Sequence, residues 1–129
     1  MPRSAYHAEL EALSVDNGTL TVYRPTGPRE LELVAATGYR RWPGRLPEQP
    51  YFYPVATEVY AREIAQRWNV SSSGAGFVTR FQVKRSFLER YQPHQVGGRE
   101  HVEWWIPAED LDALNDNIVG VIEVVGEYA

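Results

Sequence analysis

The sequence predicts an α+β fold with a largely antiparallel sheet. Stretches in which apolar and polar residues alternate are typical of half-buried strands, and they recur in the second half of the chain. Helical periodicity is limited to a few segments with capping residues at their starts. The elements come as one or two helices, then short strands with helical turns, an order that favours antiparallel pairing.

The chain length and composition favour one domain over residues 1–129. Of the 129 residues, 43% are hydrophobic and 23% charged, so a single core can bury roughly two-thirds of the unfolded surface. The sequence contains no repeat, low-complexity segment or domain linker. We therefore interpret all elements as parts of one folding unit.

The first elements are a short helix, a turn and a strand. A helix is expected over 4–13, and the Asp-Asn-Gly triplet at 16–18 is a strong turn signal. The sequence TLTVYR at 19–24 alternates in the manner of a strand, and Pro25 ends this run.

A helix and a long loop come next. Residues 26–38 read TGPRELELVAATG, with Pro28 at the first helical position and Gly38 at the stop. Residues 39–50 are proline-rich and aperiodic, which predicts a long loop of the kind that often covers a site. The loop carries three arginines, Arg40, Arg41 and Arg45.

The middle of the chain predicts a short aromatic strand, YFY at 51–53, and then a helix. Thr57 has the side chain of an N-cap. Four apolar residues that follow it recur at the helical period and predict a buried face: Ala61, Ile64, Ala65 and Trp68. The sequence NVSSSGAG at 69–76 is expected to be a flexible turn.

The second half predicts strands separated by short helical segments. GFVTRFQV at 76–83 alternates cleanly, so one of its faces should be buried. SFLERY at 86–91 suggests a helical turn, and a strand is expected over 101–106. PAEDLDALND at 107–116 has the proline and acidic residues of a helix start, and IVGVIEVV at 118–125 predicts a final strand.

The strand over 101–106 places a carboxylate beside a large aromatic residue. Alternate strand residues share a face, so His101, Glu103 and Trp105 point one way. The neighbouring apolar residues point the other way, toward the expected core: Val102, Trp104 and Ile106. Glu103 is therefore expected either on the solvent-exposed face of a sheet or in a cleft.

The composition argues against several classes of function. The formal net charge is −4, so no global positive field would attract nucleic acid or an anionic membrane. The chain has no cysteine and only three histidines, so we expect no structural metal. No segment approaches the roughly 20 apolar residues that a bilayer span needs, and a soluble, cytoplasmic protein is expected.

Four groups of residues could carry chemistry, and each also has a structural explanation. Tyr23 and Arg24 could form a site or simply a solvated strand end, and the run 51–53 could be core packing. His101 and Glu103 could be functional or exposed strand neighbours. The basic residues of a strand and its end could bind nucleic acid or form an ordinary solvated face: Arg80, Lys84 and Arg85. No dinucleotide, phosphate-loop, zinc-protease or serine-hydrolase motif competes with these groups.

Seven stretches, in this order, resemble the ADP-ribosyltransferase superfamily. They are LTVYRP, a helix ending at Gly38, RLPEQPYFYPV, EVYAREIAQRW, GFVTRFQV and HVEWWIPAEDL before GVIEVV. More closely, they are similar to small bacterial proteins labelled ADP-ribosylation/crystallin-type. The resemblance covers about residues 20–125, and it implies two small sheets around a cleft with a few short helices.

The resemblance also implies an activity. Members of the superfamily bind NAD as a substrate, break its nicotinamide–ribose bond and transfer ADP-ribose to an acceptor. The resemblance assigns Glu103 as the catalytic carboxylate, which would stabilise an oxocarbenium-like ribose. It assigns NAD binding to the first strand and the aromatic run, and loop position suggests two further arginines for the phosphates. The implied binding residues are Tyr23, Arg24, Tyr51, Phe52, Tyr53, Arg41 and Arg45.

The sequence departs from the superfamily pattern at two places. It has no Ser-Thr-Ser strand motif, and His101 stands where arginine-modifying members carry an acidic residue or glutamine. Both departures argue against arginine modification. His101 is then either a base toward a nucleic-acid or small-molecule acceptor or a structural neighbour of Glu103.

Other functions remain open for this sequence. A non-catalytic module on the same fold would bind a nucleotide or ADP-ribose without turnover. Removal of ADP-ribose is less well supported, because the hydrolases with a similar label are larger helical proteins with acidic metal-binding clusters. A nucleic-acid module that uses Arg80 and Lys84 fits the strand but not the net charge. The acceptor is not specified by the sequence.

Overall fold

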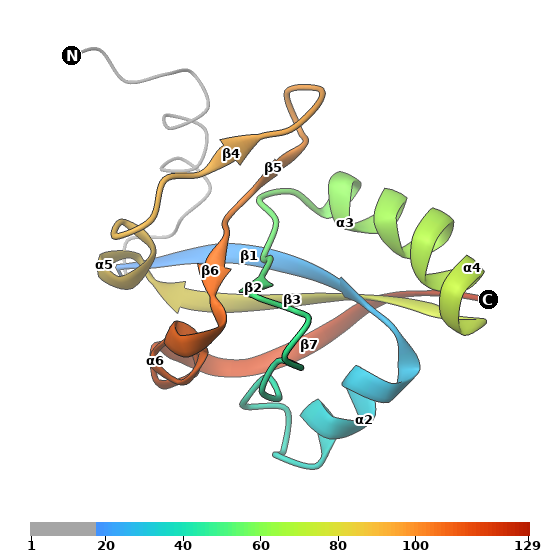
Figure 1. The fold of residues 1–129 in the computed structure, drawn as a ribbon, viewed down its shortest axis with the longest axis horizontal. Helices are drawn as coiled ribbons and strands as arrows, with labels where there is room; N and C mark the ends of the chain where they lie inside the picture. The colour runs from blue at the N-terminus through green and yellow to red at the C-terminus, as the bar shows by residue number, and fades with distance from the viewer. Residues whose placement is uncertain (1–17) are drawn as a thin grey trace.

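The structure is a computed structural model that describes residues 18–129 of the chain (Figure 1). The helix expected over 4–13 and the start of the turn at 16–18 lie outside these residues. The strands are β1 (Thr19–Thr26), β2 (Tyr51–Phe52), β3 (Gly76–Lys84), β4 (His94–Gln95), β5 (Val102–Glu103), β6 (Ile106–Pro107) and β7 (Ile118–Tyr128). The helices are α2 (Pro28–Ala35), α3 (Glu58–Ile64), the π-helical turn η1 (Ala65–Asn69), α4 (Val70–Ser73), α5 (Arg85–Leu88), the 3-10 turn η2 (Ala108–Asp110) and α6 (Leu111–Asp116).

The fold is mixed α and β with small antiparallel sheets, as the sequence predicts. The largest sheet has three strands in the order β1-β3-β7, and β2-β6 and β4-β5 form two-stranded pairs. Within the described residues all strand pairings are antiparallel. In Figure 1, the helical segment from α3 to α4 and helix α2 lie near the same end of the long sheet, on opposite sides of it.

The segment at 54–56 joins the long sheet to the β4-β5 pair. Val55 forms bridges with Tyr23 of β1 and with Glu103 of β5. The Val55 N–H donates to the Tyr23 carbonyl (2.7 Å), and the Tyr23 N–H donates to the Val55 carbonyl (2.9 Å). The segment around Val55 is therefore inserted between β1 and β5, and it brings three distant parts of the sequence side by side.

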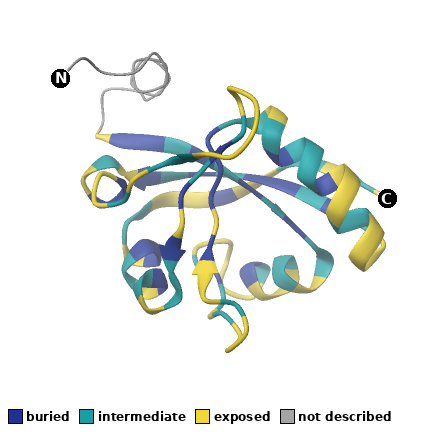
Figure 2. Cartoon of the chain, turned by 45° about the horizontal axis from the view of Figure 1, so that its top comes forward, coloured by how far each residue is buried: buried dark blue, intermediate teal, exposed yellow. Residues whose placement is uncertain are grey.

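The core consists of two clusters of apolar residues. The larger cluster lies against the long sheet and includes the buried side chains of Trp42, Phe52 and Trp104. The smaller cluster lies under α3 and contains Val55, Ala61, Ala65 and Val78. Figure 2 shows buried residues along the strands and exposed residues on the outer surface of the α3–α4 segment.

The helix after residue 57 starts as predicted but ends later. The Thr57 side chain accepts a hydrogen bond from the Tyr60 N–H (3.2 Å), which confirms the N-cap. The prediction of a flexible turn over 69–76 is wrong for residues 69–73, because η1 and α4 continue the helical segment as far as Ser73. Gly74, with φ of 80°, ends it in the left-handed conformation.

The predicted burial of Trp68 is also wrong. Its side chain is 71% exposed, although Ala61 and Ala65 on the same helical segment are fully buried. The physical reason is the π-helical turn, whose i→i+5 hydrogen bonds hold more residues per turn than an α-helix does. The wider turn carries Trp68 away from the core and places Asn69 above the sheet instead.

The other predicted elements are confirmed with shifted boundaries. Residues 39–50 form a loop without helix or strand, and β3 spans the predicted alternating stretch. Alternation over 101–106 is confirmed by burial, although its pairing is interrupted between β5 and β6. The helix expected over 107–116 starts as a 3-10 turn, and β7 extends past 125 to Tyr128.

Candidate functional site

A hollow of about 360 Å³ opens beside the end of β1, and we call it the Glu103 hollow. Its position follows from the Val55 insertion, which sets Tyr53 and Val55 between β1 and β5. The residues that line it come from five parts of the chain: Arg24, Pro25, Tyr53, Val55, Ile64, Asn69, Glu103 and Trp105. The hollow thus brings together three residues that the resemblance selects, Arg24, Tyr53 and Glu103.

Glu103 is held by two neutral hydrogen-bond donors. The Tyr60 hydroxyl donates to Oε1 (2.7 Å), and the Trp105 indole N–H donates to Oε2 (2.7 Å). Burial raises the pKa of Tyr60, and the bond to Glu103 and its negative charge raise it further, so this hydroxyl keeps its proton at neutral pH. Each carboxylate oxygen has a further lone pair, so Glu103 can still accept a hydrogen bond from a ligand.

Arg24 is committed to a second carboxylate, Glu30 of α2. Arg24 Nε and Nη2 donate to the two oxygens of Glu30 (2.7 and 3.1 Å), a bidentate pair. Thr26 Oγ1 (2.7 Å) and Arg45 Nη1 (3.3 Å) also donate to Glu30. The Arg24 guanidinium lies 4.3 Å from the centroid of the Phe52 ring, a cation–π contact.

The surroundings of Glu30 favour its charged form. Burial alone would raise the pKa of Glu30, but the charge and hydrogen bonds of Arg24, with the contributions of Thr26 and Arg45, outweigh it. The pKa of Glu30 therefore lies below its ordinary value. Burial and the nearby charge of Arg24 lower the pKa of Arg45, which remains far above neutral as an arginine does. The three side chains together carry one net positive charge.

A second hollow, of about 710 Å³, lies on the other side of Arg24, and we call it the arginine hollow. It is bounded by the start of α2, the loop at 43–49 and the end of the α4 segment. Both hollows are lined by Arg24, Pro25 and Asn69, so they adjoin at these residues, and we call the two hollows together the groove. The groove has a carboxylate and aromatic rings at one end and three arginines at the other, Arg24, Arg29 and Arg45.

An exposed aromatic surface borders the Glu103 hollow. The rings of Tyr51, Tyr53 and Trp105 lie with centroids 6.0 to 6.5 Å apart, and each side chain is between 36% and 39% exposed. His94 stacks on Trp105, with centroids 4.0 Å apart and an interplanar angle of 14°. Flat, exposed rings beside a hollow can stack on a planar heteroaromatic group.

Three of the residues that the sequence analysis suggests for NAD binding lie elsewhere. Phe52 is fully buried and packs against Trp42, because it faces inward where Tyr51 and Tyr53 face out. Arg41 lines neither hollow, and its guanidinium pairs with Asp116 of α6 (2.9 Å). Tyr23 packs against the small core under α3. In this structure Phe52 is part of the core and Arg41 forms a surface ion pair, and neither side chain lines the groove.

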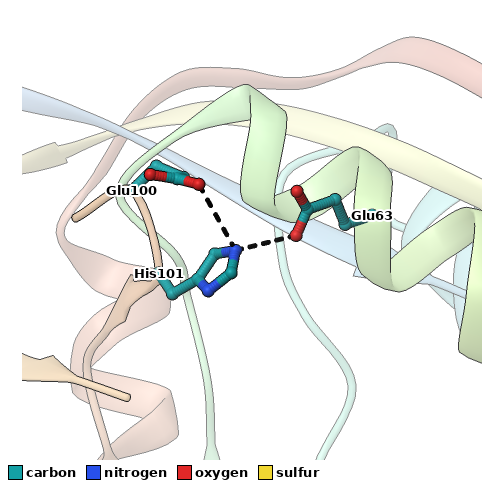
Figure 3. Close-up of side chains that lie close together, drawn as sticks. All are labelled: Glu63, Glu100 and His101. Atoms are coloured by element: carbon teal, nitrogen blue, oxygen red, sulfur yellow. Dashed lines mark hydrogen bonds and ion pairs between the residues drawn. The ribbon is translucent and has the colours of Figure 1, made fainter. Parts of the chain in front are cut away.

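His101 belongs to a separate cluster with Glu63 and Glu100 (Figure 3). Its Nδ1 accepts a hydrogen bond from the Gly98 N–H (3.0 Å), so Nε2 carries the proton and donates to Glu63 (2.8 Å). A metal ion at this cluster would need the Nε2 lone pair, which this tautomer does not offer. A base would need a free nitrogen, and His101 has none. The cluster instead ties the β4-β5 pair to α3.

Sequence reasoning missed two residues that line the groove, Glu30 and Asn69, and one that contacts Glu103 from outside it, Tyr60. Glu30 occupies the first turn of a helix, where an acidic residue is ordinary, so nothing in its position signals a buried partner for Arg24. Tyr60 sits three residues after the Thr57 cap with no motif around it. Asn69 is the last residue of a π-helical turn, which no periodicity argument for an α-helix anticipates.

Comparisons with known proteins add no assignment. No family model, no curated protein and no solved structure matches the chain. Among residues 18–129, no helix combines the length and apolar character that a membrane span requires.

Proposed function

We propose that the chain is an ADP-ribosyltransferase-like enzyme that binds NAD in the groove, cleaves its nicotinamide–ribose bond and transfers ADP-ribose to an acceptor. The observation that carries the proposal is the meeting of Arg24, Tyr53 and Glu103 around one hollow. The resemblance selects these residues for this chemistry. Arg24 and Tyr53 are 29 positions apart in the sequence, and Tyr53 and Glu103 are 50 apart.

The chemistry of the bond suits a carboxylate at this place. When the C–N bond between nicotinamide and ribose breaks, the electron pair leaves with the ring, and nicotinamide departs as a neutral molecule. The ribose carbon is left with oxocarbenium character, which a nearby negative charge stabilises. Among the residues that line the Glu103 hollow, Glu103 is the only carboxylate. We assign it to this role.

The remainder of the groove fits the other parts of NAD. Tyr53 and Trp105 offer exposed rings on which nicotinamide can stack. The arginine hollow offers the cationic surface that a pyrophosphate requires. The acceptor then attacks the ribose carbon, and its proton is lost to solvent, because His101 has no free nitrogen to take it.

A second candidate is a non-catalytic module that binds a nucleotide or ADP-ribose on the same fold. The observation in its favour is that His101 is hydrogen-bonded to Glu63 and does not line the Glu103 hollow. Among the described residues, the lining of this hollow then offers no second group to deprotonate an acceptor. This module would bind in the same groove and would leave the glycosidic bond intact.

The test is calorimetric titration of NAD into wild type and Glu103→Gln, with chromatography of the same samples for free nicotinamide. The glutamine variant keeps the shape of the side chain and removes its charge. Glu123→Gln is the matched control, because Glu123 lies on β7, lines neither hollow and pairs with Arg80 (3.3 Å).

The enzyme hypothesis predicts nicotinamide release by wild type and by Glu123→Gln, and a loss of at least about 100-fold in Glu103→Gln. Binding without release in all three proteins would favour the non-catalytic module. If NAD binds to none of them, the proposed function is wrong.

A further inference from the structure

The π-helical turn η1 sets the direction of one polar side chain. Turns of this kind are rare, and they occur frequently at functional sites. Ala61, which precedes the turn, and Ala65, its first residue, are buried in the core, and Trp68 within the turn is exposed to solvent. Asn69, the last residue of the turn, is consequently directed over the end of the sheet.

Asn69 lies where the two hollows meet. It lines the Glu103 hollow together with Ile64, and it lines the arginine hollow together with Ser73. The turn is held close to the sheet by the absence of a side chain at Gly76: a Cβ there would lie 2.9 Å from the Asn69 Cβ and would clash with the Ala65 carbonyl. The sequence thus fixes the backbone of Asn69 beside the groove.

In the part of the chain that the structure describes, the amide oxygen of Asn69 has no hydrogen-bond partner. Within residues 18–129, it is one of two buried side-chain polar atoms in this condition, and the other is Trp42 Nε1, among core residues. Buried polar atoms are normally bonded, because an unpaired one weakens the folded state. The χ2 torsion of asparagine is soft, so the amide can turn toward the groove without moving the backbone.

A second asparagine shows what a structural role requires. Asn115 is 5% exposed, and both ends of its amide are bonded to the backbone of Trp42. Its Oδ1 accepts from the backbone N–H of Trp42 (2.8 Å), and its Nδ2 donates to the backbone carbonyl of Trp42 (2.9 Å). Asn115 ties the loop at 39–50 to α6. No contact of this kind accounts for the side chain of Asn69.

We propose that Asn69 binds a sugar hydroxyl of the ligand, namely a hydroxyl of the ribose between nicotinamide and pyrophosphate. This assignment rests on the proposed function of the groove. With nicotinamide in the Glu103 hollow and pyrophosphate in the arginine hollow, that ribose lies at their junction, beside Asn69. A hydroxyl both donates and accepts, so it pairs with the amide oxygen or with the amide nitrogen.

The test combines a change in the protein with a change in the ligand. NAD and an analogue that lacks both hydroxyls of the nicotinamide ribose are titrated calorimetrically into wild type and Asn69→Ala. Asn69→Ala should bind NAD about tenfold more weakly than wild type, and the two proteins should bind the analogue equally. Contacts of Glu103 with the same ribose are lost from both proteins with the analogue, so they cancel in this comparison.

Thermal unfolding without ligand gives a readout that does not depend on NAD. Asn69→Ala removes an unpaired polar group, so its melting temperature should equal or exceed that of wild type. Asn115→Ala, the matched control, breaks two satisfied hydrogen bonds and should melt several degrees lower.

The possible failures are distinguishable. If wild type does not bind NAD, both the proposed function and the role of Asn69 are wrong. Equal NAD binding by wild type and Asn69→Ala would overturn the role of Asn69 alone. A melting temperature of Asn69→Ala as low as that of Asn115→Ala would also overturn it, because the side chain would then have a structural partner.

Discussion

Glu30 and Glu103 lie at opposite ends of one groove, and their surroundings differ in charge. Glu30 receives hydrogen bonds from two arginines and a threonine, and its side chain is 18% exposed. Among the described residues, the side chain of Glu103 receives hydrogen bonds only from the neutral groups of Tyr60 and Trp105. A carboxylate that is already neutralised by cations fixes the fold, whereas one without a cation partner can stabilise a positive charge that develops in a ligand.

The largest effect is expected from Glu30→Gln. The substitution leaves Arg24 and Arg45 partly buried without their counter-charge, so the free energy of unfolding should fall by about 3 kcal/mol. Urea unfolding measures this loss. Glu123→Gln breaks an exposed ion pair, and its free energy of unfolding should fall by less than about 1 kcal/mol. An equal loss in the two variants would contradict a structural role for Glu30.

The pH dependence of stability should carry the signature of the same residue. The pKa of Glu30 is lower in the folded protein than its value of about 4.5 in the unfolded chain. The ionised Glu30 side chain therefore stabilises the fold fully above that unfolded-state pKa, and this stabilisation is lost as the pH falls through the lower pKa of the folded state. Urea midpoints of wild type should therefore decline in this acid range. Glu30→Gln should lack that part of the decline, and an unchanged acid slope would contradict the assignment.

Tyr60→Phe should affect activity more than stability. The variant removes the hydroxyl that donates to Glu103, so the carboxylate is less well positioned and kcat for nicotinamide release should fall about tenfold. Tyr91→Phe is the matched control, because its hydroxyl donates to Asp110 (2.7 Å), which lines neither hollow. Equal kcat values for both variants would show that the Tyr60 contact does not serve the reaction.

The smallest effect is expected from Arg41→Ala. Arg41 pairs with exposed residues of α6, so its removal should change the NAD dissociation constant by less than about twofold. Arg45→Ala, in the arginine hollow, should weaken NAD binding about tenfold. Calorimetry of the two variants compares them directly, and a stronger effect of Arg41 would place the pyrophosphate outside the groove.

Local signals in the sequence were sufficient for much of the fold. Pro28 starts α2, Thr57 caps α3, and the alternation at 76–83 gives β3, because caps and strand periodicity act over a few residues. The π-helical turn was not predicted, since it depends on how the helical segment packs at Gly76. Its effect on Trp68 could not be read from an α-helical period.

The candidate site could be predicted only in part. Arg24, Tyr53 and Glu103 were selected from the sequence, and the structure places all three around one hollow. Their meeting depends on the insertion of Val55 between two strands, a long-range pairing with no local pattern. The burial of Phe52 between two exposed tyrosines follows from strand alternation, which the functional grouping of the three aromatic residues overlooked.

The most direct test of the account is an NMR titration of NAD that follows the indole N–H signals of the tryptophans, assigned by single Trp→Phe variants. Trp105 donates to Glu103 in the hollow, whereas Trp42 is buried in the core. We expect the Trp105 signal to shift with NAD and to saturate, while the Trp42 signal moves little. A Trp105 signal that stays in place at saturating NAD would contradict the assignment of the groove as the NAD site.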